Sequence, residues 1–178
     1  MRLFPVILIS FTFIVSCVKS SIEIDIERFT DSRIELMLDS MVIANGVSNA
    51  YQHKPYVYIS YIDSASCSDC ELSHFSDWKM IDHTTDTSKY NHIFIIQPRN
   101  VDKERIIEKI RTENHYLQNI YVDTIGVFKR HNPQLPKNKL LHTFMINSTQ
   151  NVVLIGSPVN NKKIEEILQT ILRETFEY

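Results

Sequence analysis

The chain contains little glycine, little proline and few cysteines. Its 178 residues include only 3 Gly, 6 Pro and 3 Cys. It also lacks a repeat of fixed period, a low-complexity tract and a block of like charge. These absences exclude a repeat protein and a low-complexity chain, and three cysteines leave none for a framework of several structural disulfides. We therefore predict one compact folding unit with short appendages.

Charge of one sign is also scarce. Charged residues make up 22% of the chain and the formal net charge is -2, so no broad basic field is present to bind a nucleic-acid backbone. We do not expect nucleic acid as a partner. The hydrophobic content of 43% is enough to form a substantial core.

The first sixteen residues differ in kind from the rest. Arg2 gives a positive start, and the run from Leu3 to Val15 is almost wholly apolar yet too short to span a bilayer comfortably. The run ends in Ile14-Val15-Ser16-Cys17, which resembles the bacterial lipobox. We predict a signal peptide over residues 1–16, cleaved before Cys17, whose lipid holds the chain to a membrane surface. A buried N-terminal helix, or a plain secretory signal with an incidental cysteine, is the alternative.

This prediction sets the expected location and domain organisation. A lipid-anchored protein of this kind lies in the bacterial cell envelope, on the outer or cytoplasmic membrane, and faces away from the cytoplasm. Residues 17–54 are expected to form a tether and N-terminal extension, with a strand or helix near Ile34 to Ile43. Residues 55–178 are expected to form the globular domain.

From residue 56 onward, strand and helix patterns alternate. Continuous apolar runs predict buried strands at 56–62, 93–96 and 120–122, and a hairpin from 143–146 and 152–155. Apolar residues at helical spacing predict helices after the first and second strands and at the C-terminus; the stripes are Leu72, Phe75, Trp78 and Ile81, then Ile106, Ile107 and Ile110, and finally Ile164, Ile167, Leu168, Ile171, Leu172 and Phe176. The order predicts an α/β fold.

Two cysteines remain after Cys17 is assigned to the lipid. Cys67 and Cys70 form a lone C-x-x-C pair between the first strand and the following helix. In an oxidising compartment such a pair is a redox-active disulfide, a static structural disulfide or half of a metal site. Haem attachment is disfavoured because Glu71, rather than His, follows Cys70.

The arrangement around this pair resembles a known family. A strand leading into C-x-x-C at a helix start, then strand, helix, hairpin and final helix, is similar to the thioredoxin order from about Pro55 to Tyr178. Residues 121–128 look like the inserted strand-turn of membrane-anchored thioredoxins, and residues 141–146 resemble the segment that enters the hairpin. The closest overall resemblance is to thioredoxin-like lipoproteins of unassigned function.

The resemblance carries several expectations. It implies a thioredoxin-like α/β fold with a central mixed sheet flanked by helices. It also implies a thiol-disulfide oxidoreductase that acts on exported protein thiols and disulfides and works with an unidentified redox partner. The substrate groove would be at His142 and Thr143, and we expect neither a cofactor nor a resident metal.

The sequence also departs from the family pattern. His142 stands where thioredoxins have a cis-proline, Tyr61 aligns with their buried carboxylate, and Ser68-Asp69 replaces their Gly-Pro. A binding or scaffold lipoprotein with a structural disulfide is therefore an alternative. A copper carrier is another, because His142 would face the C-x-x-C pair and His74 is an additional ligand candidate.

Disulfide exchange requires one accessible thiolate and a second thiol that releases the mixed disulfide. At a helix start, free N–H groups and the helix dipole should hold the pKa of Cys67 below the free value of roughly 8.5, which makes Cys67 the predicted nucleophile. Cys70, expected to be the more buried of the two, is the predicted resolving thiol. The carboxylate of Asp69 lies near this thiolate in the sequence and should raise the pKa of Cys67, which makes the disulfide less oxidising. We therefore expect a reductant or isomerase rather than an oxidant.

Overall fold

A six-stranded mixed sheet forms the centre of the computed structural model, which describes residues 19–46, 54–113 and 119–174. The predicted signal peptide and Cys17 lie outside these residues, as does the side chain of Asp69. The strand order is β1-β4-β3-β2-β5-β6. The strands are β1 (Val42–Asn45), β2 (Tyr56–Ile62), β3 (Tyr90–Ile96), β4 (Asn119–Val122), β5 (Thr143–Asn147) and β6 (Val152–Ile155). Strands β2, β3 and β4 are parallel, whereas β1, β5 and β6 run antiparallel to their neighbours.

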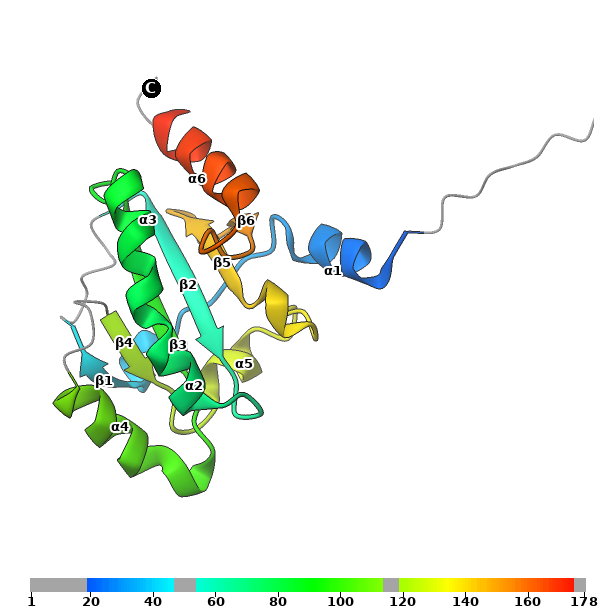
Figure 1. The fold of residues 1–178 in the computed structure, drawn as a ribbon. Coiled ribbons are helices and arrows are strands. Elements are labelled where there is room, and N and C mark those ends of the chain that lie inside the picture. Colours follow the sequence, from blue (N-terminus) through cyan, green and yellow to red (C-terminus); the bar gives the residue numbers. More distant parts are fainter. Residues whose placement is uncertain (1–18, 47–53, 114–118, 175–178) are drawn as a thin grey trace, which may run out of the picture.

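Six α-helices accompany the sheet among the described residues (Figure 1). They are α1 (Ser21–Phe29), α2 (Ser68–Ser73), α3 (Trp78–Thr84), α4 (Lys103–Thr112), α5 (Val127–His131) and α6 (Lys162–Glu174). The stripe predicted over residues 72–81 is buried, but a 3-10 turn at Phe75–Asp77 divides it between α2 and α3. The mixed sheet with flanking helices confirms the predicted fold class.

Each face of the sheet packs against its own apolar cluster. On one face, Tyr58 and Ile62 of β2 contact buried side chains of α2, α3, α4 and α6. On the other face, Ile59 and Tyr61 pack with Phe128 of α5, Phe29 at the end of α1 and the apolar residues between 34 and 41. The alternation along β2 explains why the strand reads as a continuous apolar run, since both of its faces are covered.

The N-terminal extension packs on the sheet. Neither a strand nor a helix spans the predicted range from Ile34 to Ile43, where a 3-10 turn precedes β1. The unpredicted helix α1 begins with a capping box formed by Ser20 and Glu23. Just after α1, the chain bonds with the hairpin turn and with Val152, the first residue of β6, and an isolated bridge joins Arg33 to Asn151. No helix in the described ranges is long and apolar enough to cross a membrane.

The candidate site lies at the carboxyl ends of the three parallel strands. Strand β2 ends at Ile62, directly before the segment that carries the two cysteines, and β3 and β4 end at the same edge. Strand β5 begins there, because Thr143 pairs with Ser60 of the antiparallel β2. Ligand sites of open α/β sheets form at this edge.

Candidate functional site

The two cysteines lie at the start of α2. Cys67 is the N-cap residue and is joined to Cys70 by a disulfide, with their Cα atoms 5.3 Å apart. The backbone N–H of Cys70 donates a hydrogen bond to Sγ of Cys67 at 3.3 Å. This is the helix-start position that the sequence predicts for Cys67. Both cysteines are exposed, so the expectation of a more buried Cys70 is not met in the disulfide form.

The buried carboxylate of Asp63 holds the loop that leads to Cys67. Oδ1 of Asp63 accepts hydrogen bonds from the N–H of Ala65 and the hydroxyl of Ser66, both at 3.1 Å. The ammonium groups of Lys139 and Lys129 lie 3.0 Å and 3.9 Å from its two oxygens. Burial raises the pKa of Asp63, but the hydrogen bonds from Lys139 and Ser66 outweigh it and hold the pKa below its ordinary value.

His142 faces inward and is held in place. Its Nε2 lies 2.8 Å from the carbonyl oxygen of Pro136, and its ring packs 5.3 Å from that of Tyr61. Burial lowers its pKa more than the bond to Pro136 raises it. No cis peptide bond occurs among the described residues, and the backbone N–H of His142 donates to Lys139 within the chain. Where thioredoxins have a cis-proline, this chain therefore has His142 with a trans peptide bond, directly after the 3-10 turn Lys139–Leu141.

Tyr61 shows the second departure. Its hydroxyl donates to Oε1 of Gln97 at 2.6 Å, and its ring packs against Phe128. Burial raises its pKa above the ordinary value of a phenol. Its side chain packs in the core cluster on the face of the sheet opposite α2.

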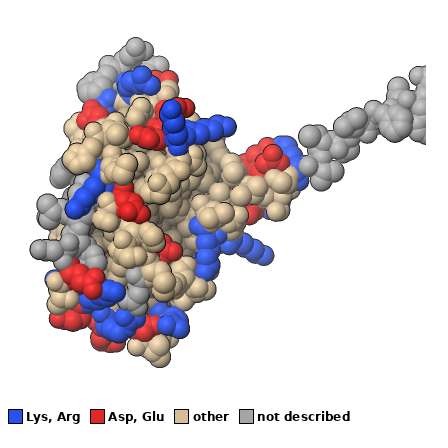
Figure 2. Space-filling view, in the orientation of Figure 1, with Lys and Arg blue, Asp and Glu red and all other residues tan. Residues whose placement is uncertain are grey.

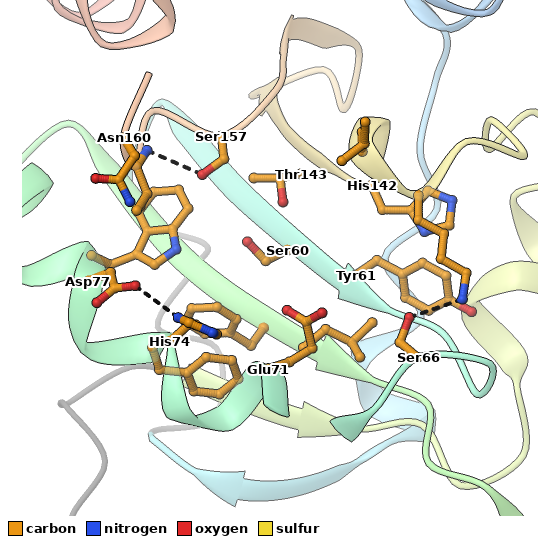
Figure 3. A pocket seen from close by; sticks show the side chains of 17 residues that line it. Ser60, Tyr61, Ser66, Glu71, His74, Asp77, His142, Thr143, Ser157 and Asn160 are labelled. Carbon is orange, nitrogen blue, oxygen red and sulfur yellow. Dashed lines mark hydrogen bonds and ion pairs between the residues drawn. The ribbon is translucent and has the colours of Figure 1, made fainter. Parts of the chain in front are cut away.

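A pocket of about 420 Å³ is lined by Ser66 and Glu71, the residues that flank the two cysteines in the sequence (Figure 3). We call it the aromatic pocket, because the buried rings of Phe75, Trp78 and Phe94 line it. Around them, Glu71, His74 and Asp77 come from the α2 side, His142 and Thr143 from the start of β5, and Ser157 and Asn160 from the loop before α6. In Figure 2 the centre of the face shown is hollowed and mostly tan, with acidic and basic side chains around it. The charged residues that line the pocket are Glu71, Asp77 and Lys139. The predicted groove residues thus line one pocket together.

A buried polar pair lies under the aromatic pocket. Oγ of Ser60 is 3.1 Å from Nε2 of His92, and both residues are buried. The His92 ring packs against Trp78, with centroids 3.7 Å apart, and against Phe94 at 4.2 Å. Ser60 and its cross-strand neighbour Thr143 are both small, which leaves room for the pocket at the centre of the sheet.

A second pocket adjoins the other side of Cys67. This arginine pocket, of about 410 Å³, is lined by residues 64–68 and by Arg99, Asp102 and Arg105. Asp102 accepts from Nε of Arg99 at 2.9 Å and from Nη2 of Arg105 at 3.3 Å. Ser66 lines both pockets, so the cysteine motif lies between them.

The structure brings the predicted site residues together as two neighbouring pairs. Cys67 and Cys70 are together, and His142 and Thr143 line the neighbouring pocket. Within the described part of the chain, no group of three His, Cys, Asp or Glu side chains is arranged to hold a metal ion. Sequence reasoning did not connect Asp63 with Lys139. The one sequence signal at Asp63 is a carboxylate directly after a buried strand, because its partner lies 76 positions away, in the 3-10 turn Lys139–Leu141.

Comparison with known proteins bears on the fold. No family model and no curated protein sequence matches the chain. Among solved structures, the N-terminal domain of PilB from Neisseria gonorrhoeae aligns with a TM-score of 0.54 and 16% identity, over 80% of this chain and 97% of that one. The thioredoxin domain of a thiol-disulfide oxidoreductase from Bacteroides vulgatus gives 0.49 and 13%, over 78% and 97%. Copper-bound yeast Sco1 gives 0.49 and 11%, over 80% and 92%. The strand order, the Cys67–Cys70 disulfide at a helix start and the likeness to the PilB domain show that this chain has a thioredoxin-like fold.

Proposed function

We propose that the protein is an envelope thiol-disulfide oxidoreductase that acts on exported proteins through Cys67 and Cys70. The fold supports a redox or metal-binding role in general. The observation that carries the redox choice is the exposed Cys67 at the N-cap of α2, with a backbone N–H directed at its sulfur and Cys70 one turn away. That N–H stabilises negative charge on the sulfur that attacks.

The reaction balances without a cofactor. The Cys67 thiolate attacks one sulfur of a target disulfide, which forms a mixed disulfide and releases one target thiolate. The Cys70 thiolate then attacks Sγ of Cys67, closes the internal disulfide and releases the second target thiolate. The target gains two electrons and the dithiol loses two, so a separate exported or membrane reductant must restore the pair. Target segments would lie in the aromatic pocket beside His142 and Thr143.

The first test is reduction of insulin disulfides by the chain with Cys17→Ser, which leaves only the pair as thiols. We expect this protein to catalyse reduction, and the further change Cys67→Ser to abolish it. Cys70→Ser should instead trap mixed disulfides, because the first step proceeds and the second cannot. Full activity in the Cys67→Ser protein would refute the mechanism.

The reduction potential of the pair supplies a second test. A value between about -120 and -270 mV, from equilibration with glutathione buffers and thiol trapping, is the range of working oxidoreductases. We expect a value in the reducing or isomerase part of this range. A value near that of the strongest periplasmic oxidants would contradict this direction.

The second candidate is a binding lipoprotein in which the disulfide only stabilises the fold. The inward-facing His142 and the trans turn before it favour this candidate, because they replace the groove element of thioredoxins. It predicts a potential below about -300 mV and thiols protected from trapping in the native protein.

We also propose that a lipid on Cys17 anchors the protein to the membrane. The supporting observation is the apolar run that ends in Ser16-Cys17. Mass spectrometry of the mature N-terminus should find an acylated Cys17, and Cys17→Ser should release the protein from the membrane fraction. An unmodified mature N-terminus elsewhere would refute the proposal.

A further inference from the structure

The resolving step needs a group that takes the proton from Cys70. In the described residues the two buried aspartates are already engaged. The oxygens of Asp123 accept the N–H groups of Val127 and Phe128, both at 2.9 Å. Asp63 accepts from Ser66 and lies against Lys139, and a carboxylate held ionised in this way is a poor base for a thiol.

His74 is the C-cap residue of α2 and lies four positions after Cys70. Its backbone is helical at φ -94° and ψ -2°, and its N–H donates to the carbonyl of Glu71. Side chains four positions apart on a helix are neighbours, about 5–6 Å apart at Cβ. His74 is exposed and lines the aromatic pocket on the α2 side (Figure 3).

Asp77 orients the imidazole of His74. Its Oδ2 lies 3.2 Å from Nδ1 of the ring, and since a carboxylate only accepts, Nδ1 carries the hydrogen. In the neutral ring, Nε2 is then left with its lone pair, which is the form that can accept a proton. A base oriented by a third group is one part of the arrangement that general-base catalysis requires, and the four-residue spacing is what would bring this base toward Cys70.

We infer that His74 is the general base of the resolving step and that Asp77 is its positioning residue. This inference rests on the proposed redox function. Nε2 of His74 removes the proton from Cys70, the resulting thiolate attacks Sγ of Cys67, and the bond between Sγ and the target sulfur breaks. The imidazolium then returns the proton to the departing target thiolate, so the base is regenerated.

Glu71 is the rival base. It follows Cys70 directly, is exposed and lines the same pocket. Adjacent helix residues point in directions about 100° apart, whereas residues four apart share a face. The position of His74 therefore suits Cys70 better than that of Glu71.

A single-turnover reaction separates the two chemical steps. The reduced Cys17→Ser protein, in excess, is mixed rapidly with 5,5'-dithiobis(2-nitrobenzoate) in buffers free of imidazole. Attack by Cys67 releases a first thionitrobenzoate, and resolution by Cys70 releases a second. The Cys17→Ser protein is compared with the same protein that also carries His74→Gln, Asp77→Asn or Glu71→Gln. His83→Gln on α3 serves as the matched histidine control.

We expect His74→Gln to slow the second release roughly tenfold or more at neutral pH and to leave the first within about twofold. Asp77→Asn should slow the second release less and alter its pH profile. A normal second release in His74→Gln, or an equal slowing in Glu71→Gln and His83→Gln, would overturn the inference while the redox function stands. If the Cys17→Ser protein without a further substitution released no thionitrobenzoate, the redox function itself would be overturned, and with it this inference.

Discussion

The ammonium nitrogen of Lys139 lies 3.0 Å from Oδ1 of Asp63 and 3.3 Å from Oγ of Ser66. Lys139 belongs to the turn before His142, whereas Asp63 and Ser66 belong to the loop before Cys67. The ion pair thus ties together the two segments that flank the dithiol.

Asp63→Asn should lower the free energy of unfolding by about 1–3 kcal/mol, because the buried acceptor of several donors loses its charge. The pKa of Asp63 is lower in the folded state than its ordinary value of 3.8. Its contribution is therefore complete above that value and is lost as the pH falls through the lower folded value. Urea unfolding of both proteins, followed by circular dichroism at pH 7 and at decreasing pH, measures this. Glu108→Gln, an exposed change on α4, is the control and should have little effect. Equal stability of Asp63→Asn and the wild type would contradict the prediction.

His142 should make folding sensitive to mild acid. Its pKa is lowered from 6.5 in the folded state, so the unfolded chain binds a proton first as the pH falls below about 6.5 and is stabilised by it. The free energy of unfolding of the wild type should therefore decrease between pH 7.5 and the lower folded pKa. His142→Gln, which keeps a donor for the Pro136 carbonyl, should reduce this slope. An unchanged slope in urea unfolding across that range would rule out the role given to His142.

Asp123 should be essential for the start of α5. The carboxylate is fully buried and accepts both the Val127 and Phe128 N–H groups. Asp123→Ala leaves two buried donors unpaired and should cost about 2 kcal/mol or more. Asp123→Asn retains one carbonyl oxygen and should cost less. Thermal and urea unfolding should rank the three proteins in this order; a harmless Asp123→Ala would show that α5 does not depend on the carboxylate.

Trp78 should be a main support of the core under the aromatic pocket. Its ring lies 3.7 Å from His92 and 5.1 Å from Tyr58 between centroids, and it is 5% exposed. Trp78→Ala should cost about 3–5 kcal/mol in unfolding by circular dichroism, and Trp78→Phe less. Met80→Ala, at an exposed position of the same helix, should remain within about 0.5 kcal/mol of the wild type. Similar losses at the two positions would contradict the assigned packing.

The globular part could be predicted because its elements carry strong local signals. Strand β2 is a continuous β-branched and aromatic run, and α6 has a regular stripe that buries Leu168 and Leu172. Both signals depend only on neighbouring residues. The position of Cys67 followed from the same local order of strand and helix.

The N-terminal elements could not be predicted in the same way. In α1, Ile22, Ile24 and Ile26 alternate with acidic residues, which is a strand-like period in a helix that the Ser20 capping box starts. Strand β1 forms through pairing with β4 about 75 positions later, so little in its own residues marks it. The inward position of His142 also depends on a distant ring, that of Tyr61.

The way the N-terminal segment joins the sheet determines how the molecule would be held. Ile34 donates to Gln150, and Asp31 and Ser32 bond with Val152, at the hairpin end of β5 and β6. This end lies beside Tyr56, the first residue of β2, whereas the cysteines follow the last. If a lipid is attached to Cys17 as we propose, it would hold the protein from the end of the sheet opposite Cys67 and Cys70 and leave these two residues on the side that faces away from the anchor.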